Sequence, residues 1–214
     1  MAGNSSVRSP RILGLTGPIA CGKTTVGGLL LRLGALSRID ADSVVHELMV
    51  VDTPANAAIQ HRFGPNVIAE DGSVDRGQLG NLVFGDPAAL RDLEAIVHPE
   101  VRAEIRRRVQ SYANQAGVVV VDAVKLLQSD LLPLCEAVWV VHCEREVEMA
   151  RLVEIRGLSP DAARHRLDAQ PIFDSPAVTW VIDNSGSLTE LEAQVHAAWE
   201  ALTQQTSDRR ENAE

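Results

Sequence analysis

The chain has 214 residues, of which 45% are hydrophobic and 3% aromatic, and its formal net charge at pH 7 is −9. This length supports one sizeable core with a subordinate lobe, and it excludes two large independent domains. The acidic balance argues against a general affinity for nucleic acid, and the scarcity of aromatic residues excludes the stacking platform of a single-strand binder.

The segment from residue 11 to residue 34 predicts a strand, a phosphate-binding loop and a helix. Residues 11–16 are a short, mostly apolar run that suits a buried parallel strand. Gly17–Thr24 follows with the spacing G-x-x-x-x-G-K-[ST], and apolar residues then recur at helical spacing until Gly34. Because the motif stands between a strand and a helix, a phosphate-binding loop is favoured over an accidental match in a glycine-bearing turn.

Each residue type in this loop has a physical role. Gly17 and Gly22 permit backbone angles and close approaches that a side chain would obstruct. Lys23 places a positive charge between the β- and γ-phosphates, and the Thr24 hydroxyl can ligate Mg²⁺. The loop therefore predicts a phosphoryl-transfer enzyme that binds a polyphosphate with Mg²⁺.

The second predicted strand, residues 35–39, ends in two acids. Asp40 and Asp42 follow it, and a helix carrying His46 comes next. In an open α/β sheet ligands lie at the carboxyl ends of strands, so this acidic pair is expected at the same mouth as the phosphate loop. Either acid can also cap the following helix. We expect one carboxylate to serve each role.

Residues 52–116 predict a series of short helices separated by turn signals, without the alternation typical of strands. A simple crossover needs far fewer residues, so this stretch is predicted to be an inserted helical lobe that helps to form a substrate pocket. It contains Arg76, Phe84 and the pair His98-Pro99. A basic run from Arg102 to Arg108 suits a solvated helix face better than a binding patch.

Residues 117–122 are the clearest strand of the chain, a β-branched run that ends in Asp122. An acid at this position is a candidate for a contact with Mg²⁺ or its bound water, and a helix or turn cap is an equally good interpretation. Further buried strands are predicted at residues 137–142 and 179–184. A closing helix is predicted at residues 188–202.

Two helices over about residues 144–170 carry several arginines, among them Arg151 and Arg156 on the first helix. Surface solubility explains most of these side chains. A helical hairpin with arginines between two strands is also how a lid closes over transferred phosphate.

The cysteines and the chain ends bear on the cellular compartment. The three cysteines form no C-x-x-C pair, so neither a disulfide framework nor a zinc site is predicted, and a reducing cytoplasm fits best. No apolar run approaches membrane-spanning length, and residues 1–10 lack the apolar core of a signal peptide. We therefore expect a cytoplasmic protein with no membrane or nucleic-acid partner. Residues 1–10 and 203–214 are expected to be flexible tails.

The motifs together resemble the dephospho-CoA kinase family, over about residues 11–202. The matching elements are the phosphate loop, the Asp-x-Asp element with His46, the segment from Asp71 to Pro87, His98-Pro99, the stretch from Arg151 to Ser159, Gln170, and Ile182-Asp183-Asn184. The phosphate loop is shared by many families, but its combination with the other elements is specific.

The resemblance implies transfer of the γ-phosphoryl group of ATP to the ribose 3′-hydroxyl of dephospho-CoA. It implies an α/β fold of P-loop kinase type, similar to nucleoside-monophosphate kinases, with a five-stranded parallel sheet flanked by helices. The single kinase domain would span residues 11–202, with a core of residues 11–51 and 117–202, a lid at about 144–170 and a CoA-binding insert at 52–116. We expect a monomer or a small homo-oligomer.

The resemblance also implies roles for individual residues. Asp42 is implied as the base, with Lys23 and Arg151 as the other catalytic residues. The residues implied in nucleotide binding are Gly17, Ala20, Cys21, Gly22, Lys23, Thr24, Thr25, Arg156 and Asn184. Those implied in substrate binding are Thr16, Asp42, His46, Arg76, Phe84, His98 and Pro99, and those implied in metal binding are Thr24 and Asp122.

The chain departs from the family pattern after the third strand. Where the family usually has Pro and Glu, this chain has Lys125 and Ser129, and Asp122 lies one residue earlier than the family's acid. A shift of one residue on a strand reverses the direction of the side chain. Near Trp180, an acid that the family often carries is absent.

Two other functions compete with this one. Shikimate-type kinases also combine a Gly-Lys-Thr loop with an Asp-x-Asp element, but the long insert with His98-Pro99 favours a larger substrate. A regulator that binds ATP without phosphorylating anything is the alternative from a different class. It predicts nucleotide binding without turnover on any small alcohol.

Overall fold

The computed structural model describes residues 9–211 and divides into two compact units. Unit 1 comprises the described residues up to Arg38 together with those from Tyr112 onward, and unit 2 is Ile39–Ser111. The sequence predicted an insert of residues 52–116, whereas unit 2 begins earlier and ends earlier. Helix α2 (Ala41–Leu48) belongs to unit 2 because it packs on other helices of that unit.

Within the described residues, the sheet has five strands in the order β2-β3-β1-β4-β5, which confirms the predicted parallel α/β fold. The central strand β1 pairs in parallel with β3 and β4, and β4 pairs in parallel with β5 at the edge. The strand bounds are β1 Arg11–Thr16, β2 Ser37–Asp40, β3 Val118–Asp122, β4 Ala137–His142 and β5 Trp180–Asp183. Each lies within one or two residues of the predicted range.

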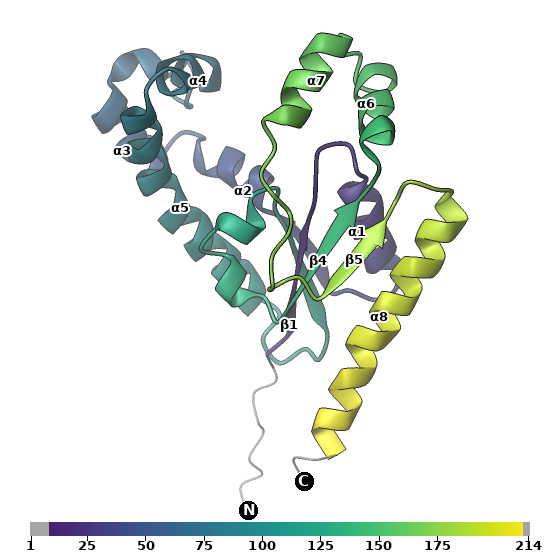
Figure 1. The fold of residues 1–214 in the computed structure, drawn as a ribbon. Coiled ribbons are helices and arrows are strands. Elements are labelled where there is room, and N and C mark those ends of the chain that lie inside the picture. Colours follow the sequence, from purple (N-terminus) through teal and green to yellow (C-terminus); the bar gives the residue numbers. More distant parts are fainter. Residues whose placement is uncertain (1–8, 212–214) are drawn as a thin grey trace, which may run out of the picture. The chain divides into compact units, whose positions relative to one another are not determined.

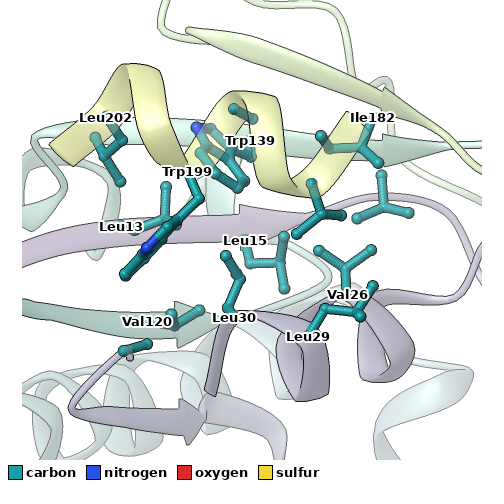
Figure 2. Packing of buried hydrophobic residues seen from close by; sticks show 14 of the residues in the cluster. Leu13, Leu15, Val26, Leu29, Leu30, Val120, Trp139, Ile182, Trp199 and Leu202 are labelled. Carbon is teal, nitrogen blue, oxygen red and sulfur yellow. The ribbon is translucent and has the colours of Figure 1, made fainter. Parts of the chain in front are cut away.

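The core of unit 1 packs between one face of the sheet and two helices, α1 and α8 (Figure 2). Leu13 and Leu15 of β1 are completely or almost completely buried, because β1 has neighbours on both edges and a covered face. In Figure 2, Leu30 of α1 and Trp199 of α8 approach these leucines from the two helices. With few aromatics in the chain, aliphatic side chains make up most of this core.

The other elements of unit 1 connect the strands, except for α8, which follows the last strand (Figure 1). Two short 3₁₀ helices separate β3 from β4, and α6 and α7 pack together as the predicted helical hairpin between β4 and β5. The bounds are α1 Lys23–Arg32, η2 Leu126–Gln128, η3 Leu132–Leu134, α6 Arg145–Glu154, α7 Pro160–Asp168 and α8 Leu188–Glu211.

Helix α8 continues to Glu211, beyond the predicted end at residue 202. The extension contains no glycine or proline, so nothing in it interrupts a helix. The remaining residues of the predicted tails, 1–8 and 212–214, lie outside the described residues. No helix within residues 9–211 is both long and apolar enough to cross a membrane.

Unit 2 is helical, as predicted for the insert. Its helices are α2, α3 Pro54–Phe63, η1 Pro65–Val67, α4 Arg76–Phe84 and α5 Pro87–Gln110. Helix α5 has 24 residues and contains Pro99 in its interior, whereas the sequence predicted only short helices. Capping side chains start the four α-helices: Asp40, Thr53, Asp75 and Asp86 accept hydrogen bonds from backbone N–H groups of the first turn.

Candidate active site

The phosphate loop leaves β1 at Gly17, where only glycine fits. Its φ is +144°, and a Cβ there would lie 2.1 Å from the carbonyl oxygen of Val141 on β4. Gly22, with φ +91°, is the residue before α1, and a Cβ there would lie 2.2 Å from the Asn184 side chain. The two glycines therefore let the loop pass close to the carboxyl ends of β4 and β5.

Lys23 and Thr24 begin helix α1 beside the loop. The Lys23 ammonium donates hydrogen bonds to the carbonyl oxygens of Gly17 at 2.7 Å and Pro18 at 3.2 Å, so it is held over the loop. Thr24 and Thr25 are exposed in the first turn of α1. A helix N-terminus with backbone N–H groups, an ammonium group and hydroxyl groups favours a polyphosphate with its cation.

Arg151 and Asn184 bind the loop from two other elements. The Arg151 guanidinium, on α6, donates to the carbonyl oxygens of Ala20 at 3.2 Å and Asn184 at 3.0 Å. The buried Asn184 amide, just after β5, donates to the Cys21 carbonyl oxygen at 2.8 Å. The structure thus brings both predicted residues to the loop, while Arg156 is exposed beyond the end of α6.

Gln170 is a loop contact that sequence reasoning did not assign to the site. Its side-chain oxygen accepts a hydrogen bond from the backbone N–H of Ile19 at 2.5 Å. The only signal in the sequence was its place among the matching elements of the family resemblance. Gln170 follows α7. The helical hairpin therefore contacts the loop twice, through Arg151 on its first helix and through Gln170 just after its second helix.

Two predicted site residues have structural partners. Asp122 is buried and accepts hydrogen bonds from the Arg38 guanidinium at 2.5 and 3.1 Å. The Thr16 side chain is fully buried, and its hydroxyl donates to the Val124 carbonyl oxygen at 3.0 Å. Arg38 therefore neutralises the acid at the end of β3, a pairing that neither residue's position in the sequence indicates.

In unit 2, the acid that ends β2 and the acid two residues later differ in their contacts. Asp40 caps α2, because its carboxylate accepts hydrogen bonds from the N–H groups of Asp42 and Ser43 at 3.0 and 3.1 Å. Asp42 is exposed in the first turn of α2, and His46, four residues later, is exposed on the same face. The expectation that one acid is a cap is met by Asp40.

The other predicted substrate residues lie on helices of unit 2. Phe84, the last residue of α4, is 93% exposed, although large apolar side chains are costly to expose to water. Arg76 is exposed in the first turn of α4, and His98 and Pro99 are exposed in the middle of α5. Exposure makes these side chains available to a ligand.

Comparison with known proteins identifies the family. Residues 11–190 match the family model described as dephospho-CoA kinase. The dephospho-CoA kinase of Symbiobacterium thermophilum is 47% identical over 194 residues, which cover 89% of this chain and 81% of that protein. The dephospho-CoA kinase of Leifsonia xyli subsp. xyli is 41% identical over 197 residues, covering 90% and 98%.

A solved structure shares the fold over most of the chain. The crystal structure of TT1252 from Thermus thermophilus superposes with a TM-score of 0.76 at 30% identity, covering 91% of this chain and 99% of that one. The phosphate loop, its arginine and asparagine contacts and the helical hairpin all lie within the matched range. The chain therefore belongs to the dephospho-CoA kinase family.

Proposed function

We propose that this protein transfers the γ-phosphoryl group of ATP to the ribose 3′-hydroxyl of dephospho-CoA, giving coenzyme A and ADP. The observation that carries the proposal is the phosphate loop between β1 and α1, in a chain of this family. Family membership makes a shikimate-type kinase or a non-catalytic regulator the weaker alternatives. The free cysteines favour the cytoplasm as its location.

In unit 1, Lys23 and Arg151 are the cations that we assign to the phosphates. To bind them, the Lys23 ammonium exchanges its hydrogen bonds to the loop carbonyls for phosphate oxygens. Arg151 stabilises the charge that spreads over the transferred group, which is largest in the transition state. Its loss should therefore lower turnover more than it weakens ATP binding.

The Thr24 hydroxyl, exposed where α1 begins, suits Mg²⁺, which prefers oxygen ligands and keeps several waters. Bound Mg²⁺ would neutralise charge on the phosphate oxygens. Asp122 is already paired with Arg38, so we assign it to contact through water rather than to direct ligation.

In unit 2, Asp42 is the group that we assign as the base. A ribose hydroxyl is a weak nucleophile, and a carboxylate within hydrogen-bond reach can orient it and accept its proton. Since Asp40 is occupied as a helix cap, Asp42 is the better candidate of the two. We assign His46, Arg76, Phe84, His98 and Pro99 to binding of dephospho-CoA, with the exposed Phe84 ring as an apolar contact.

The test is an assay of the purified protein with ATP, Mg²⁺ and dephospho-CoA, followed by mass analysis of the products. A product heavier than dephospho-CoA by one phosphoryl group, together with ADP, is expected. Shikimate is the control acceptor. Phosphorylation of shikimate but not of dephospho-CoA, or ATP binding without any phosphorylated product, would favour the alternatives.

A further inference from the structure

A buried cluster of two thiols and a carboxylate lies against the phosphate loop. Cys21 is the loop residue before Gly22, Cys143 directly follows β4, and Glu148 lies on α6. The two sulfur atoms are 2.6 Å apart, and the Cys21 sulfur lies 3.1 Å from a Glu148 carboxylate oxygen. None of the three side chains is more than 5% exposed.

The fold holds these two thiols together although they are 122 residues apart in the chain. Thr16, immediately before the loop, pairs with Val140 in the sheet. Gly17 then passes against the Val141 carbonyl, two residues before Cys143. The loop and the end of β4 therefore run side by side, and the thiol contact follows from the same backbone arrangement as the phosphate loop itself.

The spacing of the sulfur atoms favours a covalent link over a shared metal ion. Two thiolates on one tetrahedral zinc ion, each at about 2.3 Å from it, are separated by roughly 3.8 Å. A disulfide joins its sulfur atoms at about 2.05 Å. The two sulfur atoms, 2.6 Å apart, are too close to share a zinc ion. They need to move only slightly towards each other to form a disulfide.

The electrostatic environment differs between the two thiols. The hydrogen bond with Cys21 lowers the pKa of the Cys143 thiol, and the positive charge of Arg151 acts in the same direction. The hydrogen bond to Cys143, followed by burial and by the bond to Glu148, raises the pKa of the Cys21 thiol. Because the thiolate is the nucleophile, Cys143 is the sulfur that reacts first with an oxidant.

We propose that Cys21 and Cys143 form a reversible disulfide on exposure to a peroxide, and that this link prevents the phosphate loop from binding nucleotide. The Cys143 thiolate attacks one peroxide oxygen, the O–O bond breaks, and a sulfenic acid forms with release of hydroxide. Cys21 then loses its proton to Glu148 and attacks the Cys143 sulfur. The S–S bond forms, the S–O bond breaks, and the departing hydroxide takes up that proton as water.

The link acts on nucleotide binding because of the residues that adjoin it. Gly22 and Lys23 follow Cys21 directly, and the Cys21 carbonyl already accepts the hydrogen bond from Asn184. A bond from the Cys21 side chain to the end of β4 adds a second fixed point, so the loop can no longer adjust around a phosphate. This effect rests on the proposed nucleotide-binding role of the loop, whereas the disulfide itself does not.

The experiment uses the whole protein with Cys135 replaced, since Cys135 and Cys143 share one tryptic peptide. Burial raises the pKa of Cys135 to about 12, and Cys135 lies outside the cluster, so Cys135→Ala is a suitable background. The protein is treated with hydrogen peroxide, digested without reductant and examined by mass spectrometry. Nucleotide binding is measured by calorimetry, because the thiol of dephospho-CoA would reduce the link during a kinase assay.

We expect a linked pair of peptides, 12–23 with 126–145, and a loss of ATP binding in proportion to the linked fraction, with recovery after dithiothreitol. Adding Cys143→Ala should abolish both the linked peptides and the loss of ATP binding. Peptides without the link overturn the proposal, as does fully linked protein that binds ATP normally. Loss of binding with Zn²⁺ alone, reversed by a chelator, would assign the cluster to a metal instead.

Failure of the proposed function gives a different result. If the reduced protein does not phosphorylate dephospho-CoA, the proposed reaction is wrong whether or not the linked peptides appear. If it does so and no linked peptides form under peroxide, only the redox proposal is wrong.

Discussion

At the scale of single residues, Asp40 and Asp42 show how a structure separates two similar side chains. Asp40 ends β2 and Asp42 lies two residues later, and from the sequence either could cap the next helix. The structure gives the cap to Asp40 through two backbone hydrogen bonds. Asp40 therefore holds the start of α2, and Asp42 is the acid that we propose as the base.

Replacing Asp42 by Asn should lower turnover by roughly 10²- to 10⁴-fold, the usual size of a general-base contribution. The amide keeps the shape and hydrogen bonding of the side chain but removes the negative charge, so binding of dephospho-CoA should change little. Steady-state kinetics and calorimetry would measure the two effects. Asp40→Asn is the matched control, because Asn is also a good cap; if it abolishes turnover while Asp42→Asn does not, the assignment is reversed.

The motif made the loop residues predictable, whereas contacts between distant segments could not be predicted from the sequence. Gly17, Gly22 and Lys23 are recognised by spacing, because each has a role set by backbone geometry or charge. The pairing of Asp122 with Arg38 could not be predicted, since 84 residues separate them and each alone suits several roles.

At the scale of elements, buried strands were predicted most reliably, because runs such as residues 118–121 are apolar and β-branched throughout. Helix lengths were less predictable. Pro99 signals a break, yet α5 continues through it, since Val97, Val101 and Ile105 are buried on the same helix. Packing of this apolar face outweighs the local preference of one residue.

Two neighbouring glycines in α1 provide a matched test of packing. Gly28 has no atom within 4 Å of a built Cβ, so Gly28→Ala should stabilise the protein by about 0.5–1 kcal/mol through helix propensity. Gly27→Ala should lack this gain, because its Cβ would lie 2.5 Å from Arg38 Cδ, whose guanidinium Asp122 holds. Urea unfolding measures both, and equal gains in stability would contradict the tight packing described at Gly27.

Glu104 on α5 predicts a pH dependence of stability. Hydrogen bonds from Arg107 and Arg108 lower its pKa from the ordinary 4.5 to about 2. Since the folded pKa is depressed, its contribution is complete above pH 4.5 and is lost as the pH falls towards 2. Glu104→Gln should cost about 1 kcal/mol at pH 7, discounted for partial exposure, and progressively less below pH 4.5. Urea unfolding at pH 7 and pH 3 tests this; an equal cost at both pH values would exclude the ion pairs as its source.

At the scale of the whole molecule, ATP binding should increase the free energy of unfolding. A ligand that binds only the folded state, at 100 times its dissociation constant, adds about 2.7 kcal/mol to the free energy of unfolding. Lys23→Ala should remove most of this gain, since it removes the ammonium that we assign to the phosphates. Thermal unfolding with and without ATP measures the difference, and an unchanged shift in the variant would argue against the assigned role of Lys23.

The division into two units also has a consequence for how the chain folds as it is made. The central strand β1 pairs with β3 and β4, and the whole of unit 2 is synthesised between them. At about 5–20 residues per second, the ribosome needs on the order of 10 s to reach the end of β4 after completing β1. During that interval β1 lacks both strands that flank it in the folded protein, which makes the nascent chain a natural client for chaperones that shield exposed strands.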